Sequence, residues 1–224
     1  MEMIILKVEE IFFRDMYHQI CLLTDAALAQ KFIDLLEMDD EKPDGLLAYG
    51  YIDKDAGFTF SILGGAKTSG GKLKIFPINY KKAALVRRGG AAEADVKILT
   101  DDYALAFRDR MQMINDTFAV DDAREQTRFI KNLDAFRHPD YPDDVVVYFF
   151  SAEDKPELLW VRCLSVDENI LNGELLNEPT KNFGCHAGDK IKFGVAKIGE
   201  QNILLHLPTT EGNVTLHPTD ALEQ

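Results

Sequence analysis

Residues 158–193 read LLWVRCLSVDENILNGELLNEPTKNFGCHAGDKIKF, a stretch that contains the only tryptophan of the chain. Hydrophobic side chains alternate along its first part. Because successive side chains of a strand point to opposite faces, Leu158, Trp160 and Arg162 share one face, and the residues between them share the other. The alternation predicts a strand over residues 158–165.

Turn-forming residues follow this strand. The polar residues at 167–169 predict a tight turn, and residues 170–176 predict a second strand that ends before Pro179. The Asn172-Gly173 pair inside that strand predicts a bulge or tight bend, because glycine adopts backbone conformations that other residues avoid. The stretch therefore predicts consecutive strands joined by short turns.

Further short strands are predicted on both sides of this pair. Residues 145–151 have the character of a buried strand, and the segments at 190–195, 202–207 and 214–216 also have strand character. About six short strands at such spacing are typical of a small antiparallel β domain or a partly open barrel. The predicted fold class is α+β, with this β domain at the C-terminal side.

Residues 138–144, HPDYPDD, predict a domain boundary. Two prolines within four residues end a preceding helix and stiffen the chain. We therefore expect an N-terminal α+β domain over residues 1–138 and a C-terminal β-rich domain over residues 139–224. His138 and Asp140 have the residue types of a general-base pair, but a histidine that stabilises a helix C-terminus is the simpler interpretation.

The N-terminal domain is predicted to contain a sheet and about three helices. Apolar stripes at helical spacing predict one helix from Thr24 or Asp25 to about Met38, and two more that begin at Thr100 and at Asp122, the last with a capping-box-like Glu125. These two are expected to pack antiparallel, with their stripes in the core. Strands are predicted at residues 3–8, 11–13, 19–23, 46–52, 58–63 and 72–80.

The glycine-rich residues 64–72 invite comparison with a phosphate-binding loop. Such a loop needs Ser or Thr directly after its lysine and must open a helix. Here Leu73 follows Lys72, and a strand is predicted at that point. The segment is therefore interpreted as a mobile connection between strands.

Composition narrows the class of protein. The longest apolar run, residues 145–150, is far shorter than the roughly 20 residues that span a bilayer, and the N-terminus lacks the basic flank of a signal peptide. Three cysteines, an odd number without paired spacing, are typical of a reducing compartment and argue against a disulfide framework. We expect a cytoplasmic protein without a membrane span or a cofactor.

Charge is distributed unevenly along the chain, whose net charge is −13. Residues 139–224 carry 15 acidic and 6 basic side chains, hence −9, and residues 1–138 carry 23 and 19, hence −4. An acidic domain repels nucleic acid and favours a basic protein partner. Residues 56–92 contain seven Lys or Arg and no acid, which is interpreted as a solvated face or as a docking surface for an acidic partner.

The motifs Trp160-Val161-Arg162, Asn172-Gly173, the LLNEP of residues 175–179, Phe183-Gly184 and Gly188-Asp189 occur in this order. The combination resembles small bacterial domains of unknown function, whose pattern runs from a tryptophan strand through LNEP to GD. Some of these domains are similar to immunity proteins encoded near polymorphic toxins. The resemblance covers residues 145–195 and implies a β-rich binding module, with no catalytic residues to transfer.

Cys185 and His186 are adjacent, and a thiol with a neighbouring base is the arrangement of a thiol hydrolase. Adjacent residues of extended chain point to opposite sides, so only a special turn would join them. A metal site of His186 and Asp189 with His206 or His217 lacks a recurring ligand spacing. Asn177 and Asp189 have the chemistry of turn residues.

The main expectation is a non-enzymatic, immunity-like binding protein whose acidic C-terminal domain engages a basic protein. The alternative is a hydrolase or small-ligand protein with a site around Glu178, Cys185 and His186. Self-association of the basic window with the acidic half is a third interpretation. The residues predicted to bind are Trp160, Arg162, Asn177, Glu178, Phe183, His186 and Asp189.

Overall fold

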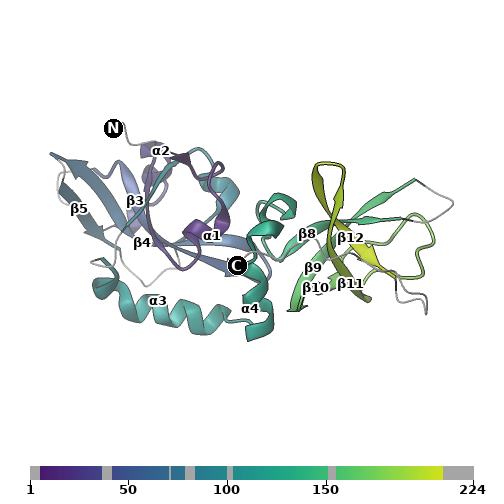
Figure 1. The fold of residues 1–224 in the computed structure, drawn as a ribbon. Helices are drawn as coiled ribbons and strands as arrows, with labels where there is room; N and C mark the ends of the chain where they lie inside the picture. Colours follow the sequence, from purple (N-terminus) through teal and green to yellow (C-terminus); the bar gives the residue numbers. More distant parts are fainter. Residues whose placement is uncertain are drawn as a thin grey trace. The chain divides into compact units, whose positions relative to one another are not determined.

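The computed structural model describes residues 6–36, 42–70, 72–78, 84–99, 103–150 and 155–208 (Figure 1). The chain forms two compact units, Met1–Ala119 and Val120–Gln224. The predicted α+β class is confirmed: the first unit holds a large antiparallel sheet with helices, and the second holds a β-barrel. Residues 120–138, which the proline-rich boundary assigned to the N-terminal domain, group with the barrel.

The sheet of the first unit is antiparallel throughout and has the order β1-β7-β2-β3-β4-β5, with β6 paired to β4. The strands are β1 Leu6–Lys7, β2 Ile20–Thr24, β3 Gly45–Asp53, β4 Gly57–Ser69, β5 Lys72–Pro77, β6 Leu85–Arg87 and β7 Asp95–Ile98. The predicted hairpin around residues 53–57 is confirmed as the β3–β4 connection, and Gly57 has a positive φ of 77° there.

Alternate residues of the central strands belong to two apolar layers, one on each face of the sheet. One layer contains Leu46, Phe58 and Phe60 and packs with α1 (Phe13–Met16) and α2 (Ala26–Gln30). The opposite layer contains the neighbouring strand residues and packs with α3 (Ala104–Phe118). The predicted stripe of α3, from Tyr103 to Phe118, is confirmed as core packing.

Two local predictions in this unit were wrong. Residues 11–13 do not form a strand; α1 begins at Phe13, because Phe13 and Met16 point into the core one helical turn apart. The helix predicted to reach Met38 ends at Gln30, although Asp25 caps it as expected by accepting from the Ala27 and Leu28 amides. A short 3₁₀ turn follows at Ile33–Leu35.

The glycine pair Gly64-Gly65 lies inside strand β4, so its interpretation as a mobile connection was wrong. A Cβ on Gly64 would lie 2.7 Å from the Phe76 carbonyl oxygen, and one on Gly65 would lie 2.6 Å from the Leu36 side chain. The glycines therefore permit close approach of β5 and a core side chain. Lys72 begins β5, as predicted, and opens no helix.

The second unit is a closed five-stranded barrel in the order β10-β11-β12-β8-β9 (Figure 1). Consecutive strands pair antiparallel, and because five is odd, the first and last strands run in the same direction and close the barrel as a parallel pair with Leu205 opposite Tyr148. The strands are β8 Asp144–Phe149, β9 Glu157–Asp167, β10 Ile170–Leu175, β11 Lys190–Ile198 and β12 Gln201–Leu207. The predicted strand at 214–216 lies outside the described residues.

The bulge predicted at Asn172-Gly173 is confirmed by a register shift between these two residues. A Cβ on Gly173 would lie 2.4 Å from the Val161 side chain inside the barrel. The core of the barrel consists of Val145, Val147, Phe149, Leu159, Val161, Cys163, Leu171, Leu175, Ile191, Phe193 and Leu204. Among the described residues, no helix is both long and apolar enough to cross a membrane.

Helix α4 (Asp122–Arg128) and the 3₁₀ helix η4 (Lys131–Phe136) precede the barrel and pack against β9 and β8. The single helix predicted from Asp122 is thus split, and its N-cap is Asp121, which accepts from the Arg124 amide at 2.9 Å. Glu125 also accepts a hydrogen bond from Arg128 at 2.9 Å. The predicted starting residue Thr100 lies outside the described residues.

Buried arginines tie these helices to the barrel. Arg128 is 1% exposed and clamps Asp143 through two hydrogen bonds of 2.8 Å, with a third to Glu125 at 2.9 Å. Arg137 donates to the backbone carbonyls of Thr127 and Pro142. The residues 138–144 are therefore a clasped turn of the second unit and not a free linker.

Loss of one partner of the buried pair will destabilise the second unit. We expect Arg128→Met to lower the free energy of unfolding by about 3–5 kcal/mol, because it leaves Asp143 buried without its counter-ion. Arg128→Met combined with Asp143→Leu should cost less than the single change. Urea unfolding followed by the fluorescence of Trp160, the only tryptophan, reports on this unit.

A surface pair provides the matched control. Glu174→Gln removes the partner of Lys190 on the exposed side of the barrel, where a pair contributes about 0–1 kcal/mol. An equal effect of Glu174→Gln and Arg128→Met would contradict the structural role of the buried clamp.

Candidate functional site

The segment of residues 176–189 joins β10 to β11 and contains most of the residues predicted to bind. Its first part continues alongside β9: the Leu176 amide donates to the Trp160 carbonyl at 2.9 Å, and the Trp160 amide donates to Asn177 Oδ1 at 2.8 Å. Thr180 is held by the Glu157 carboxylate at 3.0 Å. These bonds fix both the segment and the backbone of Trp160.

Three predicted residues converge at the second part of this segment. His186 Nδ1 donates to Glu178 Oε1 at 2.6 Å, the Ala187 amide donates to Glu178 Oε2 at 2.9 Å, and the His186 amide donates to Asp189 Oδ2 at 2.7 Å. The hydrogen bond to His186 lowers the pKa of Glu178, and the same bond raises the pKa of His186. The two side chains are 59% and 78% exposed, so the pair lies at the surface.

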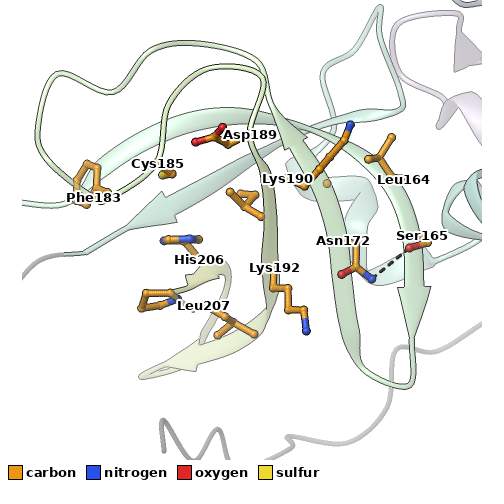
Figure 2. Close-up of a pocket in the computed structure, with 14 residues that line it drawn as sticks. Leu164, Ser165, Asn172, Phe183, Cys185, Asp189, Lys190, Lys192, His206 and Leu207 are labelled. Carbon is orange, nitrogen blue, oxygen red and sulfur yellow. Dashed lines mark hydrogen bonds between the residues drawn. The ribbon is translucent and has the colours of Figure 1, made fainter. Parts of the chain in front are cut away.

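Cys185 and Phe183 point away from this pair. The Phe183 ring lies 5.5 Å from the ring of the core residue Phe149, and Cys185 lines a cavity (Figure 2). The His186 side chain, by contrast, is 78% exposed. Burial, followed by Asp189 and Glu178, raises the pKa of the Cys185 thiol. The Cys185–His186 dyad of the hydrolase alternative is therefore not assembled, and its thiol is not activated.

The cavity has a volume of about 540 Å³. Its lining includes Phe183, Cys185, Asp189, Lys192, His206 and Leu207 (Figure 2). The ring of His206 stacks on Phe149 with centroids 4.3 Å apart, and burial lowers its pKa, so it is neutral near pH 7. Within the described ranges, no three His, Cys, Asp or Glu side chains are arranged to hold a metal ion; the candidate ligand His217 lies outside them.

An exposed apolar surface runs along the outer side of β8 and β9. We name it the aromatic strip and define it by His138, Tyr141, Tyr148, Phe150, Leu158 and Trp160. Tyr141 is 38% exposed, Phe150 43%, Leu158 51% and Trp160 36%. The strip is continuous, because β-strand pairing places Leu158 opposite Tyr148, and the His138 ring lies 5.1 Å from Trp160 and 5.3 Å from Tyr141.

Two predicted residues have structural partners. Arg162 forms two hydrogen bonds to Asp144, at 2.8 and 3.0 Å, and the hydrogen bonding to Asp144 raises the pKa of Arg162. His138 Nδ1 accepts hydrogen bonds from the backbone amides of Asp140 and Tyr141, at 3.1 and 3.2 Å. The general-base pair with the Asp140 carboxylate is not formed, and His138 instead caps a turn.

In the described part of the basic window 56–92, some cations have structural partners and others lie side by side. Arg87 pairs with Asp53 at 3.2 Å, and Arg88 is buried and donates to the Ile11 carbonyl at 2.7 Å. Lys67 lies opposite Lys74 on β4 and β5. Both arginines are thus structural, and Lys81 and Lys82 lie outside the described residues.

Searches against family models, curated proteins and solved structures found no match to this chain. The solvent exposure of Tyr141, Phe150 and Leu158 makes them functional candidates that the sequence had not indicated. The alternation along residues 158–165 had placed Leu158 and Trp160 on one face, which was the available signal.

Cysteine labelling tests whether the segment contains a nucleophile. Burial raises the pKa of Cys21 and of Cys163 to about 12, so both should resist iodoacetamide until the chain unfolds. Cys185 should react more slowly at pH 7 than glutathione, because its pKa is also raised. Mass spectrometry of the labelled peptides measures each rate, and a Cys185 faster than glutathione would revive the hydrolase alternative.

The pKa values of His186 and His206 should be shifted in opposite directions. His186 is stabilised in its charged form, so its contribution to stability is present below the ordinary imidazole pKa and lost as pH rises through its raised pKa. His206 favours its neutral form, so its contribution is lost as pH falls through its lowered pKa.

NMR titration of the imidazole signals measures both values. Glu178→Gln should return the pKa of His186 toward that of a free imidazole and leave His206 unchanged. An unchanged His186 in this variant would show that the pair does not persist in solution.

Proposed function

We propose that this chain is a non-enzymatic protein-binding module of the cytoplasm, whose barrel unit engages a basic protein partner. The observation that carries the proposal is the aromatic strip. Four apolar side chains there are at least a third exposed on a rigid barrel. Protein interfaces have such an aromatic centre, and a contiguous exposed apolar surface on a soluble domain is typical of an interaction site.

Charge supports the basic character of the partner. Residues 120–224 contain 19 acidic and 10 basic side chains, hence −9, whereas residues 1–119 contain 19 and 15, hence −4. The acidic unit therefore also bears the aromatic strip. Opposite charge around an apolar centre accelerates association and rejects acidic competitors.

Preorganisation supports binding rather than catalysis. The side chains of Asn177, Glu178 and Asp189 accept hydrogen bonds from backbone amides and so hold the segment beside the strip. Little conformational entropy is therefore lost when a partner docks. Glu178 and His186 are bonded to each other and are not directed at a reactive group. An immunity-like role, in which a rigid acidic surface covers a basic toxin, is consistent with this arrangement.

The cavity favours a second candidate function, binding of a small ligand. Cavities of roughly 300–1,000 Å³ suit small molecules, and the mouths of barrels are frequent sites for them. In the described part of the chain, the Lys192 amine and the His206 imidazole in its lining have no hydrogen-bonding protein partner. The neutral His206 and the cationic Lys192 would suit an anionic ligand with an apolar body.

Comparative affinity purification tests the first proposal. Tagged wild-type chain and the variant Tyr141→Ser/Leu158→Ser are exposed to lysate of the native host at about 0.1 and 0.5 M salt, between which surface attraction is strongly screened. We expect a protein partner that the wild type retains at low salt, that high salt releases, and whose recovery the variant reduces at least tenfold.

Ile198→Ser provides the control, because Ile198 is an exposed apolar residue of β11 outside the strip. Urea unfolding of each variant confirms that the barrel is intact. Equal recovery by all three chains, or recovery that does not depend on salt, would overturn the proposal.

A further inference from the structure

We propose that the aromatic strip recognises an extended, proline-rich segment that carries basic residues beside its prolines. The inference rests on the proposed function for the location of the surface, and it adds the conformation and composition of the partner. Four features of the barrel lead to it: closure of the sheet, orientation of the rings, rigidity of their support and surrounding charge.

Closure of the barrel disfavours binding by strand addition at the strip. Strand β8 pairs with β9 and β12, and β9 pairs with β8 and β10. Each strand thus has a neighbour on both sides, which leaves no full-length edge on which a partner could extend the hydrogen-bond ladder. Outward side chains are the main surface that the strip offers, and a polyproline helix can bind to them because it needs no ladder.

The rings of the strip present both faces and edges. The His138 ring is inclined by 62° to Trp160 and by 66° to Tyr141, with centroids 5.1 and 5.3 Å away. These edge-to-face rings expose aromatic surface on which the pyrrolidine ring of proline can pack. Further along the strip, Leu158 and Phe150 extend the apolar surface.

Hydrogen-bond donors on the rings complement a polyproline backbone. Within the described residues, neither the Trp160 indole N–H nor the Tyr141 hydroxyl is bonded to the protein. A polyproline helix has no internal hydrogen bonds, so its carbonyl oxygens are free to accept from such donors. An amphipathic helix would offer no free carbonyl along its length, because its backbone is already paired.

The supports of the rings are fixed before binding. Two backbone amides donate to His138 Nδ1, and Asn177 and Leu176 hold the backbone of Trp160. A rigid aromatic surface and a stiff polyproline segment both lose little entropy on association. This match favours the proline-rich segment over a flexible loop.

Charge near the strip selects basic flanks. Asp140 directly precedes Tyr141 in the chain, and the one cation on the outer face of β9, Arg162, is paired with Asp144 through two hydrogen bonds. Lys181 is directed to the Lys155 carbonyl. Lysine or arginine beside the prolines would therefore approach a unit with a net charge of −9 and meet no unpaired cation among the described residues on this face of β9.

Fluorescence titration of the full-length chain tests the inference directly, because Trp160 is its only tryptophan and belongs to the strip. The probe is the acetylated, amidated peptide KPPLPPLPPK. We expect a saturable change in emission with a Kd below about 1 mM, which corresponds to a weak but specific contact. Two matched peptides, one with alanine for every proline and one with glutamate for both lysines, should bind at least tenfold more weakly.

Variants locate the site of binding. Tyr141→Ala and Leu158→Ala should each weaken the proline-rich peptide at least fivefold, whereas Ile198→Ala on β11 should leave its Kd unchanged. Retained urea-unfolding midpoints show that each barrel is folded. Absence of saturation, equal binding of the alanine peptide, or equal Kd values for all variants would overturn the inference.

The outcome is separable from that of the proposed function. If purification yields a salt-sensitive partner that depends on Tyr141 and Leu158 while the peptide fails to bind, the strip binds a protein, but not through a proline-rich segment. The function then stands, and the proline-rich partner is rejected.

Discussion

The barrel unit depends on the neutralisation of charge inside it. Asp143 and Asp144 are adjacent and buried, and each carboxylate is clamped by a different arginine, Arg128 from α4 and Arg162 from β9. An unpaired buried carboxylate would destabilise the fold. Helix α4 and strands β8 and β9 must therefore pack so that each aspartate meets its arginine. Asp144 begins β8, and the turn before these two aspartates contains Tyr141 and His138.

Much of this fold follows from local patterns. The bulge at Gly173, the hairpin around Gly57 and the core face of α3 could be predicted, because each depends on neighbouring residues. The boundary at 138 could not, because the prolines of residues 138–144 are typical of a linker, whereas the clasp by Arg137 and Arg128 involves residues outside that segment. Pairing between an arginine and an aspartate 15 residues away has no local signature.

The candidate site shows the same limit. Asn177, Glu178, His186 and Asp189 were predicted and do lie in one bonded segment, because turn chemistry is local. Their exposed neighbours were not predicted. Apolar residues occur on both faces of β9, and alternation separates the two faces without telling which one the barrel encloses. Closure of the sheet decides this, and it depends on strands that follow later in the chain.

The parallel closure of β12 on β8 has a consequence for how the protein is made. Tyr148 and Leu205 are 57 residues apart, 205 minus 148, and they join the beginning of the barrel to its end. During synthesis, β8 must wait for β12 to emerge from the ribosome before its second edge is covered. Until then the nascent chain exposes an apolar strand edge, which makes the unfinished barrel prone to aggregation.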